Sequence, residues 1–196
     1  MAGVDLPFSC DCGKLRGTLL GVSPTNGTRA ECFCHDCRAT ELYANQPDPA
    51  PGAVQVYQTV PDRVRFDAGL DQLAVFSLSD KGLLRWQARC CGAVMFNTGR
   101  NPKLAFASLR TDRLEDDSPL GPVAARAFVR KANGKRGHEG GYKFLFGVLS
   151  RALTRLVTGR WKKTPFFDRS GKPVRDIHVV TAAERASLYP ASKPAT

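Results

Sequence analysis

The chain has 196 residues, of which 42% are hydrophobic, and it carries a formal net charge of +11. This composition fits one domain with a hydrophobic core. The sequence has no run of about 18 apolar residues, so we do not expect a membrane-spanning helix. The N-terminal segment MAGVDLPFSC has neither the basic nor the apolar part of a secretory signal, so we expect a cytoplasmic protein.

Short β-compatible runs dominate the first 110 residues. They cover residues 14–22, 54–60, 73–76, 83–88, 93–98 and 104–109. The runs at 83–88 and 93–98 flank Cys90-Cys91-Gly92 like the two arms of a hairpin. Short strands at this spacing predict small antiparallel sheets, and the proline-rich segment 45–52 predicts a loop. We therefore expect a mainly β unit over residues 1–116.

The remainder, residues 117–196, is predicted to be a basic and partly helical extension packed on or beside that unit, which makes the whole chain α+β. Residues 123–131 fit a short helix or a strand, and residues 132–141 read as a flexible basic loop. Residues 142–158 have helical period. A last short helix is expected from Thr181, because Thr181 and Glu184 have capping-box spacing.

The segment from Arg126 to Arg175 contains fourteen basic and only two acidic residues. Within it, one face of the predicted helix is apolar and consists of Tyr142, Leu145, Phe146, Leu149, Leu153, Leu156 and Val157. The segment fits nucleic-acid binding, with Tyr142, Phe144 and Trp161 as stacking groups, and it also fits binding to a membrane surface. The plainer expectation is a helix that packs its apolar face on the β unit and leaves a basic face, with Arg151 and Arg155, in water.

Seven cysteines fall into three tight groups, namely Cys10 and Cys12, then Cys32, Cys34 and Cys37, then Cys90 and Cys91. Spacings of one and two residues let a turn direct several sulfurs at one zinc ion. In a reducing compartment such clusters favour metal over disulfides. The first and last groups are two distant pairs, and together they are predicted to hold a closed structural zinc that joins two parts of the chain.

The middle group leaves three sulfurs on one local loop. Three thiolates around zinc leave one coordination position vacant or filled by water, and their charge weakens the metal as a Lewis acid. Such a site suits the binding of an external thiol better than the generation of hydroxide. Cys32, Cys34 and Cys37 are therefore the predicted catalytic residues, at an open zinc site for a small thiol.

The order of these motifs resembles the glutathione-dependent formaldehyde-activating enzyme family, which includes centromere protein V-like members. The matching pieces are Cys10-Asp11-Cys12-Gly13, Cys32-Phe33-Cys34-His35-Asp36-Cys37-Arg38 and Cys91-Gly92 before an apolar strand. The resemblance covers residues 8–110. It implies a β-tent zinc fold, a structural zinc on the outer groups, a catalytic zinc on the middle group, and carbon–sulfur lyase chemistry that condenses glutathione with formaldehyde.

The chain departs from that family in its last motif, which is normally C-x-x-C-G. Ala88 stands at the first cysteine position, and Cys90 instead precedes Cys91 directly. Adjacent residues of an extended strand point to opposite faces, so the two sulfurs share one ion only across a strongly bent turn. Either Cys90 replaces the missing ligand, or the structural site has three sulfurs and another group. We favour Cys90, because closed structural sites normally have four protein ligands.

Two neighbours of the middle cysteines remain. Arg38 either contacts an anion, such as a substrate carboxylate, or is an ordinary surface residue. His35 is expected to be exposed, because three sulfurs already occupy the site. The function expected overall is a zinc enzyme that joins a small thiol to an aldehyde. The alternative is a zinc-stabilised adaptor or nucleic-acid-binding protein that acts through residues 126–175.

Overall fold

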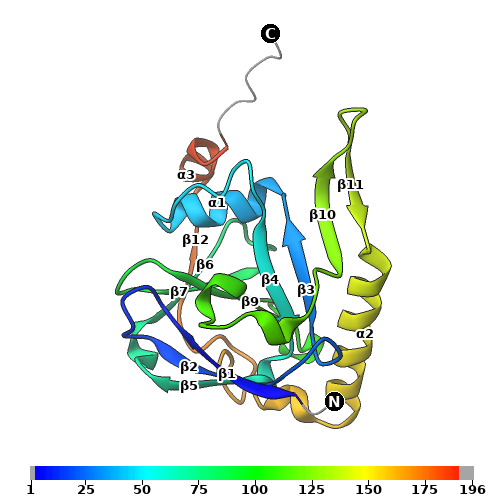
Figure 1. The fold of residues 1–196 in the computed structure, drawn as a ribbon. Helices are drawn as coiled ribbons and strands as arrows, with labels where there is room; N and C mark the ends of the chain where they lie inside the picture. Colours follow the sequence, from blue (N-terminus) through cyan, green and yellow to red (C-terminus); the bar gives the residue numbers. More distant parts are fainter. Residues whose placement is uncertain (1–2, 190–196) are drawn as a thin grey trace.

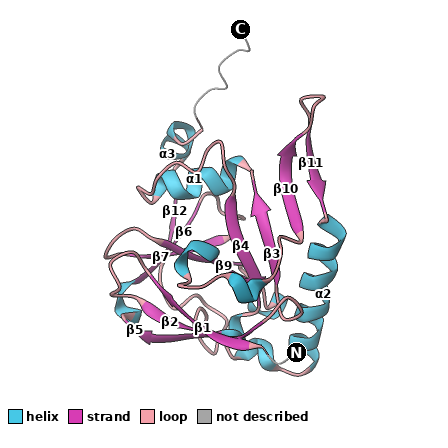
Figure 2. Cartoon of the chain, in the orientation of Figure 1, coloured by secondary structure: helices cyan, strands magenta, loops and turns pink. Residues whose placement is uncertain are grey.

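A computed structural model describes residues 3–189 of the chain, so the first two residues and residues 190–196 of the predicted extension lie outside it. The strands form two sheets (Figures 1 and 2), which confirms the predicted mainly β, α+β fold class. The smaller sheet has the order β1–β2–β5, with β1 at Val4–Ser9, β2 at Arg16–Val22 and β5 at Val64–Ala68. The larger sheet has the order β11–β10–β3–β4–β9–β8–β7–β6–β12. Its strands are β3 Thr28–Cys32, β4 Val54–Thr59, β6 Leu73–Ser77, β7 Leu84–Ala88, β8 Val94–Thr98, β9 Ala107–Arg110, β10 Ala125–Arg130, β11 Arg136–Glu139 and β12 Ile177–Val179.

The helices are α1 His35–Tyr43, α2 Gly141–Val157 and α3 Ala182–Ser187. Helix α3 begins with the predicted capping box, in which the Thr181 side chain accepts from the Glu184 N–H and the Glu184 side chain accepts from the Thr181 N–H. Across residues 3–189, no helix combines the length and the apolar composition that crossing a membrane requires.

The main core lies between the two sheets. Strand residues alternate between faces, so Phe8 and Phe66 of the small sheet meet Trp86 and Phe96 of the large sheet. The Phe8 and Phe96 rings pack edge to face with centroids 5.1 Å apart. Phe166, from the second half of the chain, is fully buried against Trp86 at a centroid distance of 5.0 Å.

The second half of the chain extends the large sheet rather than flanking the first unit. Strand β10 pairs in parallel with β3, and β12 pairs in parallel with β6, so residues after Asp117 lie at both ends of the sheet (Figure 1). The structure therefore has one small antiparallel sheet, as expected, and one large sheet that mixes parallel and antiparallel pairs. Because β3 and β6 would otherwise be edge strands, this pairing satisfies backbone groups that local sequence patterns do not reveal.

The other face of the large sheet carries a row of polar side chains. Neighbouring strands place them in register across β7, β8, β9, β4 and β3, and the row consists of Arg85, Asn97, Ser108, Gln58 and Thr28. All five are buried. The Arg85 guanidinium donates to Oδ1 of the Asn97 side chain at 2.9 Å, and Nδ2 of the same side chain donates to Ser108 Oγ at 3.2 Å. Anything that packs on this face must therefore supply polar partners.

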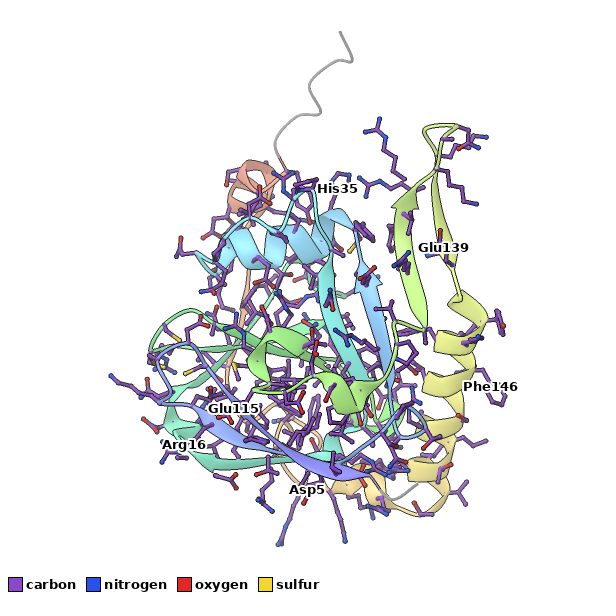
Figure 3. All side chains as sticks on the ribbon, viewed as in Figure 1. Asp5, Arg16, His35, Glu115, Glu139 and Phe146 are labelled. Atoms are coloured by element: carbon purple, nitrogen blue, oxygen red, sulfur yellow. The ribbon has the colours of Figure 1, made fainter. Side chains whose placement is uncertain are left out.

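Helix α2 packs on this polar face, and its orientation is the reverse of the expected one. Arg151 donates to Thr28 Oγ1 at 2.9 Å and to Gln58, while Arg155 pairs with Asp62. The apolar stripe faces away from the protein, and Figure 3 shows Phe146 pointing outward. The prediction that the apolar face is core was wrong, because the sheet beneath α2 requires hydrogen-bond donors.

Several segments differ from the expected local structure. Strands β1, β3 and β5 and helix α1 were not predicted, and α1 replaces the loop expected around the middle cysteines. Two further segments also differ. The predicted basic loop 132–141 contains strand β11, which forms a hairpin with β10 through a turn at Asn133-Gly134. Gly134 has φ +74°, and Asn-Gly is a strong hairpin signal, so this strand was available from the sequence. The strand expected over 104–109 begins only at Ala107, because Pro102 starts a 3₁₀ turn, η3 Pro102–Leu104.

Candidate metal centres and the adjoining cleft

The structure brings the first and last cysteine groups together. Cys10 and Cys12 follow β1, and Cys90 and Cys91 lie in the turn between β7 and β8. The Sγ atoms of Cys10 and Cys12 are 3.6 Å apart, and Cys90 Sγ lies 3.8 Å from the first and 3.3 Å from the second. All four sulfurs lie within 4.8 Å of one another, so this cluster can hold a metal ion.

The turn after β7 is bent strongly enough for both adjacent cysteines to face the same point. The N–H groups of Cys91 and Gly92 both donate to the Ala88 carbonyl, at 3.3 and 2.8 Å. Gly92 has φ +76°, and a Cβ there would lie 2.4 Å from the carbonyl oxygen of Ala44. Glycine is thus required both by the turn and by the close approach of the chain after α1.

Two further contacts hold the Cys10–Cys12 turn in place. The Leu15 N–H donates to Cys10 Sγ at 3.3 Å. Asp11, between the two cysteines, pairs with buried Arg113, which also donates to the Val94 carbonyl at 3.2 Å. The loop is therefore tied to the start of β8, close to the partner cysteines. Burial and hydrogen bonds with the Cys12 and Cys10 thiols raise the pKa of Cys90 to about 12, so a cation beside Cys90 favours loss of its proton.

The middle group forms a second cluster at the N-terminus of α1. Cys32 ends β3, Cys34 is the N-cap of α1, and Cys37 lies in its first turn. The Cys37 N–H donates to Cys34 Sγ at 3.2 Å. The three sulfurs lie within 4.8 Å of one another, so this cluster can also hold a metal ion, with one ligand fewer from the protein. The positive end of the helix dipole favours a thiolate at Cys34.

The three thiols share their protons unequally. Hydrogen bonds from Cys32 and Cys37, together with the charge of nearby Arg85, lower the pKa of Cys34 to about 2. The hydrogen bond with Cys34 raises the pKa of Cys32 to about 11. The hydrogen bonds of Cys37 with Cys32 and Cys34 raise the pKa of Cys37 as well. One thiolate therefore forms readily, whereas the second and third require a cation beside them.

The three cysteines form part of the wall of a cleft with a volume of about 1100 Å³. Its apolar wall is made by Ala30, Val56, Leu83, Phe106, Ala125, Ala127, Phe128 and Phe144. Its basic groups are Lys81, Arg85, Arg126, Arg136 and the two histidines His35 and His138. Strands β3, β7 and β8, the β10–β11 hairpin and the start of α2 all contribute. A cleft with apolar walls and a few polar groups beside reactive residues is the usual form of a ligand site.

Arg85 is the group in this cleft that sequence reasoning missed. Its side chain lies in the middle of β7, the residue is 6% exposed, and it makes no ion pair among residues 3–189. Within the part of the chain that the structure describes, its side chain donates to the Asn97 side chain. The signal in the sequence was an arginine between Leu84 and Trp86, on the face of the strand opposite to these two apolar residues. A buried cation without a carboxylate suits a site that receives negative charge.

Arg38 and His35 occupy different places. Arg38 is half-exposed and forms a two-bond ion pair with Asp48, at 2.8 and 2.6 Å, and it is not among the residues that line the cleft. His35 is exposed at the start of α1 (Figure 3), as expected, and it is not one of the clustered ligands. Its Nε2 lies 2.9 Å from the Arg136 guanidinium at the rim of the cleft.

Helix α1 connects the two clusters. Its N-cap is Cys34 and its first turn carries Cys37. The residues after its last turn contact the other cluster, where the Gln46 amide donates to the Cys91 carbonyl at 3.2 Å. In between, buried Glu41 pairs with Arg110 of β9. The position of the open cluster thus depends on the turn that holds the closed one.

Comparisons with known proteins give one family and little else. The sequence model of a family of unknown function, DUF6151, matches residues 1–178, a range that includes all seven cysteines. No curated protein matches the chain. Among solved structures, the crystal structure of a Rhodobacter sphaeroides protein from a structural genomics programme is 20% identical, with a TM-score of 0.42. The match covers 60% of this chain and 97% of that protein.

Proposed function

This chain belongs to the family of unknown function DUF6151, and we propose that it is a zinc enzyme that joins a small anionic thiol to an aldehyde. A structural zinc would be held by Cys10, Cys12, Cys90 and Cys91. A second zinc would be held by Cys32, Cys34 and Cys37. The order of the motifs, which resembles that of the glutathione-dependent formaldehyde-activating family, supports this assignment, with glutathione as the leading thiol.

The donor sets fit zinc. Thiolate sulfur is a ligand that zinc prefers, and four sulfurs suit a closed structural site, whereas three leave room for an exogenous ligand. The raised pKa values of Cys32, Cys37 and Cys90 also fit, because a divalent cation would offset the negative charge that keeps these thiols protonated.

The observation that carries the proposal is the position of the three-sulfur cluster in the cleft wall with Arg85 beside it. A zinc ion there would act as a Lewis acid that keeps an incoming thiol deprotonated near neutral pH. Arg85 would offset the negative charge of the clustered sulfurs. It would also stabilise the oxygen that becomes negative during the reaction.

In the proposed reaction, the substrate's thiolate sulfur forms a bond to the aldehyde carbon, and the carbonyl π electrons move to the oxygen, which then takes up a proton. The product is an S-hydroxyalkyl adduct, so no external oxidant or reductant is needed. Arg136 at the cleft rim suits a carboxylate of a thiol such as glutathione, whereas Arg126 already pairs with Glu31 at 2.8 Å. The apolar wall, including Phe106, Phe128 and Phe144, would limit the access of competing water.

The test combines metal content with turnover. Purified protein is expected to hold two zinc ions per chain, and to speed the formation of the hydroxymethyl adduct of glutathione, followed by NMR exchange spectroscopy. Cys34→Ser should retain one zinc and the native circular dichroism spectrum but give only the uncatalysed rate. Wild-type protein with two zinc ions and no rate above background, for glutathione or smaller thiols, would contradict the enzymatic proposal.

The alternative of a nucleic-acid-binding protein receives less support. Several of the basic residues counted in the sequence are directed into the protein, since Arg151 contacts the sheet face, Arg155 pairs with Asp62 and Arg175 donates to backbone carbonyls. Phe144, one of the expected stacking groups, lines the cleft. The basic surface is thus smaller and less continuous than the sequence indicates.

A further inference from the structure

The apolar stripe of α2 is an extensive exposed surface made by one regular element. Seven large side chains contribute to it, with exposed fractions between 46% and 78%, and they are Tyr142, Leu145, Phe146, Leu149, Leu153, Leu156 and Val157. At about 100° per residue, they occupy an arc of about 120° on the helix. Soluble monomers rarely leave an apolar surface of this extent in water.

This stripe cannot be used for the protein's own core. Arg151 and Gly147 lie on the opposite side of α2, where Arg151 donates to Thr28 and an added Cβ at Gly147 would lie 3.1 Å from Thr28 Oγ1. Arg155 is fixed by Asp62. Rotating the helix to bury the stripe would break these contacts and leave Asp62 without its Arg155 partner. The outward orientation is therefore built into the fold.

The charged side chains on α2 and on the turn η6 Arg160–Lys162 are all basic, and the acidic residue just before α2, Glu139, lies 3.9 Å from Arg126. Helix α2 contains no acidic residue, and Lys143 lies exposed in its first turn. Beyond its C-terminal end, η6 places Trp161 between two ammonium groups, Lys103 Nζ at 5.8 Å and Lys162 Nζ at 5.7 Å from the ring centroid. Lys163 follows and is also exposed. Arg160, in contrast, is neutralised by Asp62 at 2.8 Å.

We propose that α2 binds in the plane of an anionic lipid surface, with its apolar stripe among the acyl chains and with Lys143, Lys162 and Lys163 at the headgroups. An amphipathic helix with a large apolar face and basic flanks is the element that binds such surfaces. Phe146, Leu149 and Leu153 are central in the stripe. Tyr142 near one end, and Trp161 beyond the other, are the aromatic types found at headgroup level.

A second copy of the chain fits the stripe less well. An isologous contact would bring Lys143, Lys162 and Lys163 of both copies near one interface, and neither α2 nor η6 offers an acidic residue to oppose them. Anionic headgroups supply that opposite charge. The proposal is independent of the cysteine clusters and of the reaction proposed above.

The test measures binding of the full-length zinc-loaded protein to extruded vesicles by flotation. Vesicles of phosphatidylcholine with about 30% phosphatidylglycerol should bind the protein at least about tenfold more tightly than phosphatidylcholine alone, and high salt should weaken that binding. Leu149→Gln with Leu153→Gln should lower the affinity by at least about tenfold. The matched control, Ser150→Gln with Thr154→Gln, adds the same two glutamines beside the stripe and should stay within about twofold of wild type.

Folding and self-association are measured in parallel. Both double variants should retain the wild-type melting temperature, because the four replaced side chains are exposed. Sedimentation velocity should show a monomer. The proposal would be overturned if the wild-type protein bound neither kind of vesicle, or bound both with equal affinity. A dimer that dissociates in the Leu149→Gln, Leu153→Gln variant would also overturn it, since a second copy would then cover the stripe.

Discussion

Nε of Arg155 lies 3.1 Å from a carboxylate oxygen of Asp62, whose side chain is 1% exposed. Asp62 belongs to the turn between β4 and β5, so this pair fixes α2 to the body of the protein through its polar side. Arg160 approaches the other carboxylate oxygen at 2.8 Å. The basic side of α2 is therefore structural, and its apolar side is free.

This arrangement predicts an unusual pattern of stability in α2. Arg155→Met should lower the free energy of unfolding by about 2 kcal/mol, because it removes one of two cations that compensate a buried carboxylate. Leu153→Ser should cost less than about 0.5 kcal/mol, because Leu153 is 61% exposed. Urea unfolding of the zinc-loaded protein checks both values. The reverse order, with the leucine more costly, would mean that the stripe is buried in solution.

The sequence predicted the existence and limits of α2 but not its orientation. Helical period depends only on the spacing of apolar residues, and that spacing was read correctly. Which face packs inward depends on the surface that receives the helix. Here that surface is the polar row that includes Gln58 and Thr28, assembled from strands far apart in the chain. No local pattern in residues 142–158 carries that information.

The position of Cys90 predicts that it is an equal partner in the closed site. Cys90→Ser and Cys91→Ser should each remove one zinc ion per chain and lower the unfolding free energy by several kcal/mol, because structural zinc binding contributes roughly 10 kcal/mol or more. Cys32→Ser, as a control, should also reduce zinc by one but leave the fold nearly as stable. Metal analysis and thermal unfolding give both readouts. Full zinc occupancy in Cys90→Ser would instead favour a site of three sulfurs and another ligand.

The two cysteine clusters illustrate how far sequence reasoning reaches into the site. Spacing alone gave the three local groups, because ligands one to three residues apart need only a turn to converge. The joining of the first and last groups was expected instead from the four ligands that a closed zinc site needs and from the family resemblance. Arg85 and His138 were not found, since each reaches the cleft through strand pairing rather than through a motif. The cleft itself depends on the β10–β11 hairpin, whose second strand lies in the segment 132–141 that was expected to be a loop.

Arg85 is predicted to be important for the rate of the proposed thiol addition, although its side chain makes few hydrogen bonds. Arg85→Met keeps the length of the side chain and removes the charge, so kcat/KM for the proposed thiol addition should fall at least about tenfold with zinc content unchanged. Arg38→Met is the matched control, because Arg38 pairs with Asp48 on the surface, and it should stay within about twofold of wild type. Equal effects of the two changes would show that neither charge acts at the reacting centre.

Metal binding at the open cluster should depend steeply on pH, with affinity rising as pH rises. Before metal binds, Cys34 is already a thiolate because its pKa is lowered to about 2, whereas Cys32, with its pKa raised to about 11, and Cys37, with its pKa also raised, keep their protons at neutral pH. Zinc must then displace two protons, so the logarithm of the affinity should rise by about two for each pH unit between roughly pH 6 and 8.

Zinc competition with a chelating dye measures this slope, after the open site alone has been emptied by mild chelation. Calorimetry in buffers of different ionisation enthalpy counts the released protons directly. Cys34→Ser provides the control with a clear sign. Removing the Cys34 thiolate takes away one ligand, so the affinity should fall, while the slope should stay near two because burial still keeps the Cys32 and Cys37 thiols protonated between roughly pH 6 and 8. A slope near zero in the wild type would mean that all three sulfurs are already deprotonated, and that the cluster does not need a cation to stabilise its charge.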